Sequence, residues 1–508
     1  MQAKRHFKFR LKTLGTALMM GTALVTLNAH AHSSAPALED VAKVWTYNHS
    51  TATPGQIAEI LAFDPLTKTL WVVGNVLDAD ENVLGSAVDV LNAVDGSLVQ
   101  HIDTTGYGNV NSVAVQGGIA AMAFESATDR TSNGKVVLFD TTTRMPAMGV
   151  NEIEVGPLPD MVAFTHDGSR LLVANEATPS DYTGFDPAGS VSIIDMDNRT
   201  VVATPGFDGI PTEGSHIRGK AAVGMDYEPE YIAVAHNGRT AYVTLQEANA
   251  IGVLDLASNA FSKIIGLGVK DFSEPGNEID PNHKDDKIEL RAAQVKGLYQ
   301  PDAIAAYDFK GKTYLVMANE GDTREDDGDK VRVKDSGLTG YPDDLKQLNI
   351  STVDSTSGTD LITFGGRSFS IRDEDGNIVF DSGNQLDAAA IDAGIYNDSR
   401  SDDKGVEPEG VKLFKVDGRT LAFIGLERTT TSAVAVYDVT NPYQAAFLDM
   451  IVVDGDVSPE GLEAFRVNGK NYLAIANEVS GTTSVVQFDI SHSKTKGHKP
   501  KSRHHAKH

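Results

Sequence analysis

The sequence contains no cysteine among its 508 residues, and only two tryptophans, Trp45 and Trp71. The absence of cysteine excludes disulfides and thiolate metal sites. Two tryptophans argue against a quinone cofactor held by repeated tryptophans. The histidines outside the two termini lack the spacing of a zinc site. No nucleophile elbow, phosphate-binding loop or dinucleotide fingerprint occurs in a fitting strand–helix context, so neither a nucleotide nor a quinone cofactor is expected.

The sequence also lacks an apolar run long enough for a confident membrane span. The apolar stretch Leu14 to Leu27 follows a basic start and precedes Ala29-His30-Ala31, which together predict a secretory signal over residues 1–31. We therefore expect an exported protein, periplasmic or extracellular. No hydrophobic anchor follows the globular part, so the mature protein is expected to be a soluble monomer without a transmembrane segment.

Acidic residues are missing from both ends of the chain, although its formal net charge is −26. Residues 32–490 are therefore even more acidic than the whole. Such a charge argues against binding nucleic acid or an anionic membrane, and favours cations or basic partners. The basic tail, residues 491–508, holds five of the fourteen histidines and is expected to be disordered. A solvated terminus is the simpler interpretation, and a tether to an acidic polymer or a loose metal binder is the alternative.

A repeated unit organises the chain. Its fullest copy, Val406 to Arg428 (VEPEGVKLFKVDGRTLAFIGLER), begins with Pro and an acid, forms a short apolar strand, turns at Asp417-Gly418 and continues in a second apolar strand to a Glu. Close copies begin at Leu158, Glu228, Gln300 and Ser458, and weaker ones at Glu59 and Asn111. A third strand ending in Asp and a weaker fourth strand follow most copies.

Four-stranded units that recur at this length are typical of propeller blades. The sequence therefore predicts an all-β fold, a seven-bladed β-propeller over residues 32–490. The last copy ends with its third strand. The segment Val41 to Asn48 (VAKVWTYN) is the predicted donor of the missing outer strand, so that an N-terminal strand closes the ring.

Long insertions occur only between strands two and three of a unit, or between units. In a propeller these two classes of loop open on the same face, and functional loops gather on one side of a rigid scaffold. That face is the predicted binding face.

Carboxylates recur at the two positions of each unit that reach this face. The first residue of strand one is acidic in six units of seven, with Asn111 as the exception, and so is the residue that ends strand two, with Asn75 as the exception. Gathered round one opening, these groups would repel each other unless they were protonated or bound cations. Oxygen ligands suit a hard cation, so one or more Ca²⁺ sites are predicted. The candidate ligands are Glu59, Asp160, Glu176, Glu230, Glu247, Asp302, Glu320, Glu409, Glu427, Glu460 and Glu478.

A structural interpretation of the same acids is as well supported by the sequence as cation binding is. A carboxylate next to a strand end can accept backbone N–H groups, and on this interpretation each blade carries these residues because each needs the same corner. Glu125, which ends the second strand of its unit, belongs to this set.

Basic residues lie among these acids, and Arg324, Arg400, Lys404 and Arg428 are close in sequence to the predicted mouth. Ion pairing with neighbouring acids is their simpler role. Alternatively they hold a phosphate bridged to the metal, which would suit phosphoester hydrolysis.

Several long segments, among them LPDMVAFTHDGSRLLVANE, GGRSFSIRDEDGNIVFDSG and SRSDDKGVEPEGV, resemble the exported choice-of-anchor I family, which is similar to mesenchyme-specific cell-surface glycoproteins. The resemblance implies a propeller fold and, through relatives associated with calcium mineral, cation binding. Some relatives are labelled alkaline phosphatase. The leading hypothesis is an exported propeller that binds divalent cations and acts as a binding or surface-associated protein, with a phosphorylated small molecule or a cell-surface polymer as a further partner. The alternatives are a calcium-dependent phosphoesterase and a metal-free interaction platform.

Overall fold

The computed structural model describes residues 37–179, 182, 184–218, 223–324 and 328–491. Residues Pro36–Ser491 form one compact unit. The predicted signal over residues 1–31, and the predicted tail apart from Ser491, lie outside the described residues. Antiparallel sheets dominate this unit, which confirms the all-β prediction. No helix in the described ranges is long and apolar enough to cross a membrane.

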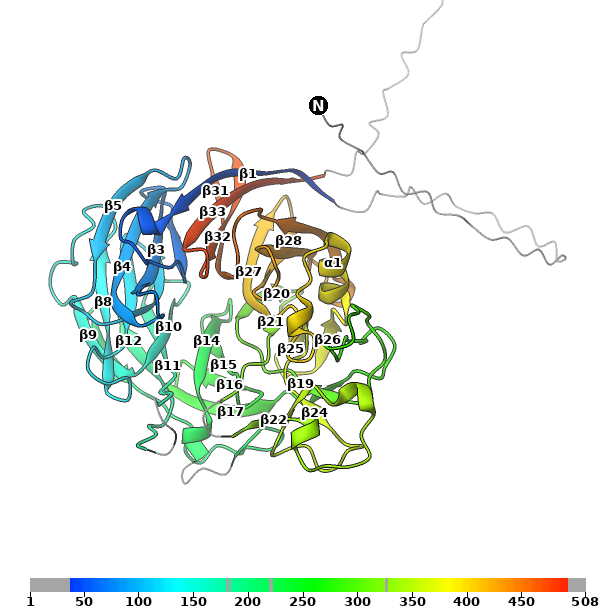
Figure 1. Ribbon diagram of the computed structural model, residues 1–508. Coiled ribbons are helices and arrows are strands. Elements are labelled where there is room, and N and C mark those ends of the chain that lie inside the picture. The colour runs from blue at the N-terminus through cyan, green and yellow to red at the C-terminus, as the bar shows by residue number, and fades with distance from the viewer. Residues whose placement is uncertain (1–36, 180–181, 183, 219–222, 325–327, 492–508) are drawn as a thin grey trace, which may run out of the picture. The chain divides into compact units, whose positions relative to one another are not determined.

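Seven sheets of the described residues have four strands each, and Figure 1 shows them arranged round a common centre. In the first four, the strands follow sequence order. These sheets are β2 (Leu61–Asp64), β3 (Thr69–Leu77), β4 (Val83–Asn92) and β5 (Leu98–Asp103); β6 (Val110–Gln116), β7 (Ile119–Phe124), β8 (Asn133–Asp140) and β9 (Glu152–Pro157); β10 (Pro159–Phe164), β11 (Arg170–Asn175), β12 (Ser190–Asp195) and β13 (Thr200–Ala203); β14 (Pro229–Val234), β15 (Thr240–Leu245), β16 (Ala250–Asp255) and β17 (Ala260–Gly266).

The other three four-stranded sheets complete the set. They are β20 (Ile304–Phe309), β21 (Lys312–Asn319), β25 (Ser368–Asp373) and β26 (Ile378–Asp381); β27 (Pro408–Val416), β28 (Arg419–Leu426), β29 (Ala433–Asp438) and β30 (Ala446–Val452); β31 (Pro459–Val467), β32 (Lys470–Asn477), β33 (Thr482–Ile490) and β1 (Leu38–Asn48). In the last sheet β1 pairs antiparallel with β33, with Leu38 opposite Ile490 and Asn48 opposite Thr482.

An eighth sheet of five strands was not anticipated from the sequence. It contains β18 (Val269–Asp271), β19 (Lys296–Leu298), β24 (Ile362–Thr363), β23 (Asn349–Ser351) and β22 (Lys330–Arg332). Two insertions, one between units and one within a unit, thus pair with each other. They share a small core that includes Phe272, Val333 and Leu361.

The helices are few and short. The α-helix α1 (Gln385–Ala393) buries Leu386 and Ala390 and ends at Gly394, whose φ of +73° terminates it in the left-handed conformation. The 3-10 turns are η1 (His49–Thr51), η2 (Val223–Asp226), η3 (Val333–Asp335), η4 (Asp343–Leu345), η5 (Asp398–Arg400) and η6 (Pro442–Gln444).

Turn chemistry explains where the hairpins form. Both residues of the pairs Lys310-Gly311, Asp417-Gly418 and Asn468-Gly469 have positive φ, as two-residue hairpin turns matched to strand twist require. The Asp that ends many third strands caps the next turn. Asp140, for example, accepts the N–H groups of Thr142 and Thr143 at 3.0 and 2.7 Å.

Apolar clusters join each sheet to its neighbours. Seven clusters each contain residues from two consecutive sheets, and one of them joins the last sheet to the first. There the rings of Phe63 and Phe465 stack with centroids 4.5 Å apart. The first strands β2, β6, β10, β14, β20, β27 and β31 contact one another in a closed cycle. The residue before or at the start of each first strand therefore faces a shared central space.

Candidate functional site

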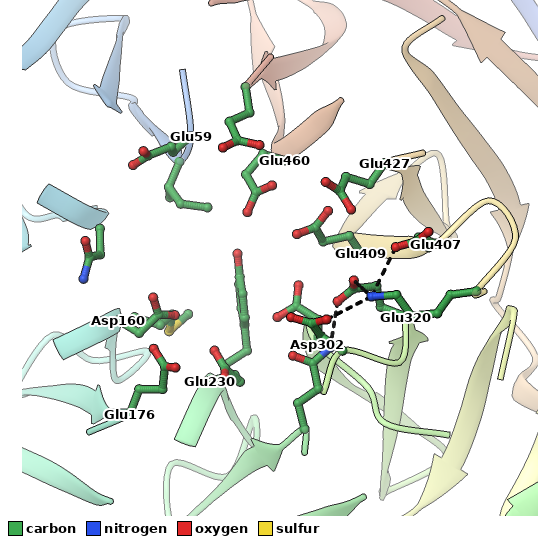
Figure 2. Close-up of a pocket in the computed structure, with 18 of the residues that line it drawn as sticks. Glu59, Asp160, Glu176, Glu230, Asp302, Glu320, Glu407, Glu409, Glu427 and Glu460 are labelled. Atoms are coloured by element: carbon green, nitrogen blue, oxygen red, sulfur yellow. Dashed lines mark hydrogen bonds and ion pairs between the residues drawn. The ribbon is translucent and has the colours of Figure 1, made fainter. Parts of the chain in front are cut away.

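A cavity of about 610 Å³ lies where the seven first strands begin. All eleven predicted metal ligands line it, together with Asn75, Asn111 and the loop acids Asp322 and Asp403. Figure 2 shows labelled carboxylates from several sheets turned toward one open space. Glu125 does not line this cavity. Its carboxylate instead accepts from the Asn109 amide and lies 3.9 Å from Arg130 Nε. The cavity also includes Lys330, Arg400 and Lys404, from long segments between strands, and Arg428, from the short connection between β28 and β29.

Local backbone irregularities orient the first-strand side chains. The pairing of the first two strands shifts register between Pro159 and Met161, and likewise between Pro408 and Val411 and between Pro459 and Leu462. Each shift includes a predicted ligand, Asp160, Glu409 or Glu460. A bulge re-aims the side chain it contains, which places these carboxylates at the mouth of the central space.

A main-chain hydrogen bond closes the corner of a sheet, where the residue after the second strand meets the residue before the first strand. The N–H of Glu176 donates to the carbonyl of Leu158 at 2.9 Å, and the N–H of Glu478 donates to that of Ser458 at 2.8 Å. The accepting residues have positive φ, 41° and 61°. Among the described residues, the carboxylates of Asp160, Glu230, Asp302 and Glu409 accept no backbone N–H group. These four carboxylates therefore take no part in the corner, whereas the Glu59 carboxylate accepts from the Asn75 main chain and, at 3.1 Å, from the Asn75 side chain, so the structural interpretation stays open there.

Burial and mutual repulsion raise the pKa of every one of the eleven predicted ligands. Burial, followed by the charge of Glu478, raises the pKa of Glu59 to about 8. Burial raises the pKa of Asp160 to about 7, although the Arg130 charge opposes the change. Burial and the charges of Asp160 and Glu228 raise the pKa of Glu176 to about 8.

The other eight carboxyls behave alike. Burial is the largest cause of the raised pKa in each of them, and the pKa of Glu427 rises to about 8. The pKa values of Glu230, Glu247, Asp302, Glu320, Glu409, Glu460 and Glu478 also lie above their ordinary values. A cation entering this cavity would release that repulsion.

Three carboxylates on one side of the cavity form a compact group. Asp160, Glu176 and Glu230 each offer an oxygen, and the three oxygens lie within 4.8 Å of one another. Within the described residues, no basic side chain forms an ion pair with any of the three. Next to them, Glu247 is 7% exposed and its Oε2 has no hydrogen-bond partner among the described residues. This half of the cavity thus gathers half-buried carboxyl groups that form no ion pair with a basic side chain of the described residues.

The opposite half contains its own cation. Lys404 Nζ lies 3.0 Å from Glu320 Oε1, 3.0 Å from Asp322 Oδ1 and 3.2 Å from Glu407 Oε2. Figure 2 shows this group of contacts beside Glu320 and Glu407. Glu320, Glu407 and Glu427 form the second group whose oxygens lie within 4.8 Å of one another.

The four candidate phosphate clamps are engaged by carboxylates. Arg324 does not line the cavity, because its guanidinium is buried and donates to Glu228 at 2.6 Å and to the Met225 carbonyl at 2.7 Å. Arg400 pairs with Glu407 at 2.6 Å, and Arg428 pairs with Glu427 at 2.8 Å. These contacts match the simpler ion-pairing role.

Glu407 and Tyr231 are among the cavity residues that the sequence reasoning missed. Glu407 is fully buried, and the only available signal was its place before Pro in a Glu-Pro-Glu sequence shared with Glu228. Tyr231 lies between this cavity and a second one of about 500 Å³ farther along the centre, since it lines both. Burial raises its pKa well above the ordinary value, so the phenol stays neutral.

Four-stranded antiparallel sheets round a central acidic cavity define a β-propeller with this cavity at one end. The chain belongs to the choice-of-anchor I domain family, whose model matches residues 59–442. The match includes Glu59 and Glu427 and stops before Glu460 and Glu478.

Among solved structures, the chain is similar to hydrazine synthase of Kuenenia stuttgartiensis, with 12% identity, a TM-score of 0.49 and coverage of 85% of this chain and 96% of that one. It is also similar to the β-propeller domain of Myceliophteria thermophila Cps50 (Swd1), with 8% identity, a TM-score of 0.45 and coverage of 88% and 99%. A comparison with curated proteins gives no match.

Proposed function

We propose that this chain is a seven-bladed β-propeller, closed by the pairing of β1 with β33, that binds divalent cations in its acidic cavity and serves as a binding protein. The closed cycle of first-strand contacts supports the blade number. The antiparallel pairing of β1 with β33 supports the closure.

The observation that carries the cation proposal is the group Asp160, Glu176 and Glu230. Oxygens that share one Ca²⁺ at about 2.4 Å lie no more than about 4.8 Å apart, and these three meet that limit. The corner hydrogen bonds leave their carboxylates available, and the neighbouring Glu247 adds an unpartnered buried oxygen.

Calcium is the favoured ion. The candidate ligands are all oxygen atoms, which suit a hard cation, and the large cavity leaves room for the water that completes a flexible coordination of six to eight. Mg²⁺ requires tighter octahedral geometry, so it is expected to bind more weakly.

Calorimetric titration of CaCl₂ into the metal-stripped protein tests this function. Saturable heat is expected, and both Glu230→Gln and Asp160→Asn are expected to weaken binding by about tenfold or more, because each removes a charge next to the ion. Glu374→Gln, at an exposed turn, is the matched control. Equal binding by all variants would show that the ion binds elsewhere and refute this site, and no heat at all would leave the metal-free interaction platform as the better description.

A calcium-dependent phosphoesterase is the second candidate. A phosphate would need free donors beside the metal, and the contacts of Arg324, Arg400, Lys404 and Arg428 with carboxylates weigh against it. Metal-dependent turnover of a phosphoester that is lost in Arg428→Ala would reverse this preference.

We further propose that the protein is exported and associates with the cell surface. Family membership supports this localisation, as does the secretory pattern over residues 1–31. Separation of cell-surface, periplasmic and cytoplasmic fractions, followed by detection of the protein, tests it.

A further inference from the structure

Of the basic residues that line the acidic cavity, Lys404 is the most buried. It follows η5 and precedes β27, and its side chain is 9% exposed. Its ammonium lies within 3.0 to 3.2 Å of oxygens from Glu320, Asp322 and Glu407, which come from two separate segments of the chain.

Other donors hold the carboxylates around it. Gln246 Nε2 donates to Glu320 Oε2 at 2.7 Å, which leaves Oε1 for Lys404. Arg400 Nε donates to Glu407 Oε1 at 2.6 Å, which leaves Oε2 for Lys404. Glu427 Oε1 is bound by Arg428 at 2.8 Å and by the Ser458 hydroxyl at 3.3 Å. Partners that fix one oxygen of a ligating carboxylate and orient the other are a feature of metal sites.

The ammonium contacts two members, Glu320 and Glu407, of a metal-like group of three carboxylates. Glu320, Glu407 and Glu427 meet the same 4.8 Å limit as the group on the opposite side of the cavity. All three are buried, and buried charges without a partner are strongly destabilising. Of the two groups, only this one has a protein cation within hydrogen-bonding distance of its carboxylates.

We propose that Lys404 occupies a second cation position as a tethered cation, and that it thereby restricts divalent metal to the half of the cavity formed by Asp160, Glu176 and Glu230. The restriction to that half rests on the proposed cation-binding function. The second position itself rests on the contacts of Lys404. Lys404 is thus a residue that determines metal stoichiometry, and its removal converts its site into one that takes a divalent ion.

The test is a terbium luminescence titration of the metal-stripped full chain, with Tb³⁺ as the probe and Ca²⁺ as the competitor. The wild type is expected to bind one equivalent and Lys404→Met two, both displaced by Ca²⁺. Lys412→Met, which removes a lysine paired with Glu463 in the second cavity, is the matched control and is expected to stay at one. If Lys404→Met does not fold, Lys404→Gln, which keeps a hydrogen-bond donor, is titrated in its place.

The outcomes separate the two proposals. No binding by the wild type with one equivalent bound by the Lys404 variant would support the second position and refute the proposed function. One equivalent in both folded proteins would overturn the role of Lys404 and leave the proposed function intact. A second equivalent that persists after Glu320→Gln is added to Lys404→Met would also overturn it, because the ion would then bind elsewhere.

Discussion

The N–H of Glu176 donates to the carbonyl oxygen of Leu158 at 2.9 Å, while the Glu176 carboxylate lines the central cavity. The residue thus closes the corner of its sheet with its main chain and leaves its side chain for another purpose. Because the main chain and the side chain of Glu176 have different contacts, the structural and the functional interpretation of the acidic positions predict different effects of changing its carboxylate.

Glu176→Gln is expected to preserve or raise the stability of the metal-free protein, because it removes a carboxyl whose ionisation is opposed by desolvation and by the charges of Asp160 and Glu228. A corner that depended on the carboxylate would instead lose about 1–3 kcal/mol. Calcium affinity is expected to fall. Urea unfolding with and without calcium measures both effects, and a loss of stability in the metal-free protein would favour the structural interpretation.

The stability of the metal-free protein is expected to decrease as the pH rises from 5 to 9. The carboxyls of Glu59, Glu176 and Glu427 have a pKa of about 8 in the fold and an ordinary value of 4.5 in the unfolded chain. Their contribution to stability is therefore complete below pH 4.5 and is lost as the pH rises through about 8.

Thermal unfolding in EDTA, recorded from pH 5 to 9, measures this dependence. Saturating calcium is expected to flatten the curve at the alkaline end, because the ion binds the ionised carboxylates. A melting temperature that rises with pH in EDTA would contradict the prediction.

His49→Ala is expected to destabilise the protein by about 1–3 kcal/mol. The buried His49 ring lies between Asp89 Oδ2, 2.7 Å from Nδ1, and the Thr483 hydroxyl, 2.8 Å from Nε2. The contacts connect the segment after β1 to the first and last four-stranded sheets. Chemical unfolding measures the loss, and His236→Ala, at an exposed position, is the control. Equal stability of the two variants would show that this contact does not hold the sheets together.

Gly461→Ala is expected to cost about 1–3 kcal/mol, because the added carbon overpacks a close contact between strands. Its Cβ would lie 2.6 Å from the carbonyl oxygen of Glu59, to which the Gly461 N–H donates at 3.0 Å. Gly106→Ala, where an added Cβ has no neighbour within 4 Å, is the control. A melting temperature of Gly461→Ala equal to that of the wild type would show that the two strands can move apart freely.

Much of the fold could be predicted from the sequence because its determinants are local. Hairpin turns such as Asp417-Gly418 need residues that tolerate positive φ. The apolar pattern of a strand likewise involves only residues that are close together in the chain. The repeat then places Asp160, Glu230 and Glu460 at equivalent positions, so their convergence at one opening follows from counting strands. The sequence by itself therefore determined the all-β class and the candidate residues of the acidic cavity.

Only the tertiary structure decided how those residues divide. Lys404 and Glu320 are far apart in the chain, and their contact depends on how two insertions fold over one end of the sheets. The five-stranded sheet has the same origin, since β19 and β24 pair only after both insertions are in place. Such contacts between distant segments leave no periodic pattern in the sequence. For this reason the sequence could name the carboxylates but not which of them are paired with a lysine and which have no protein cation beside them.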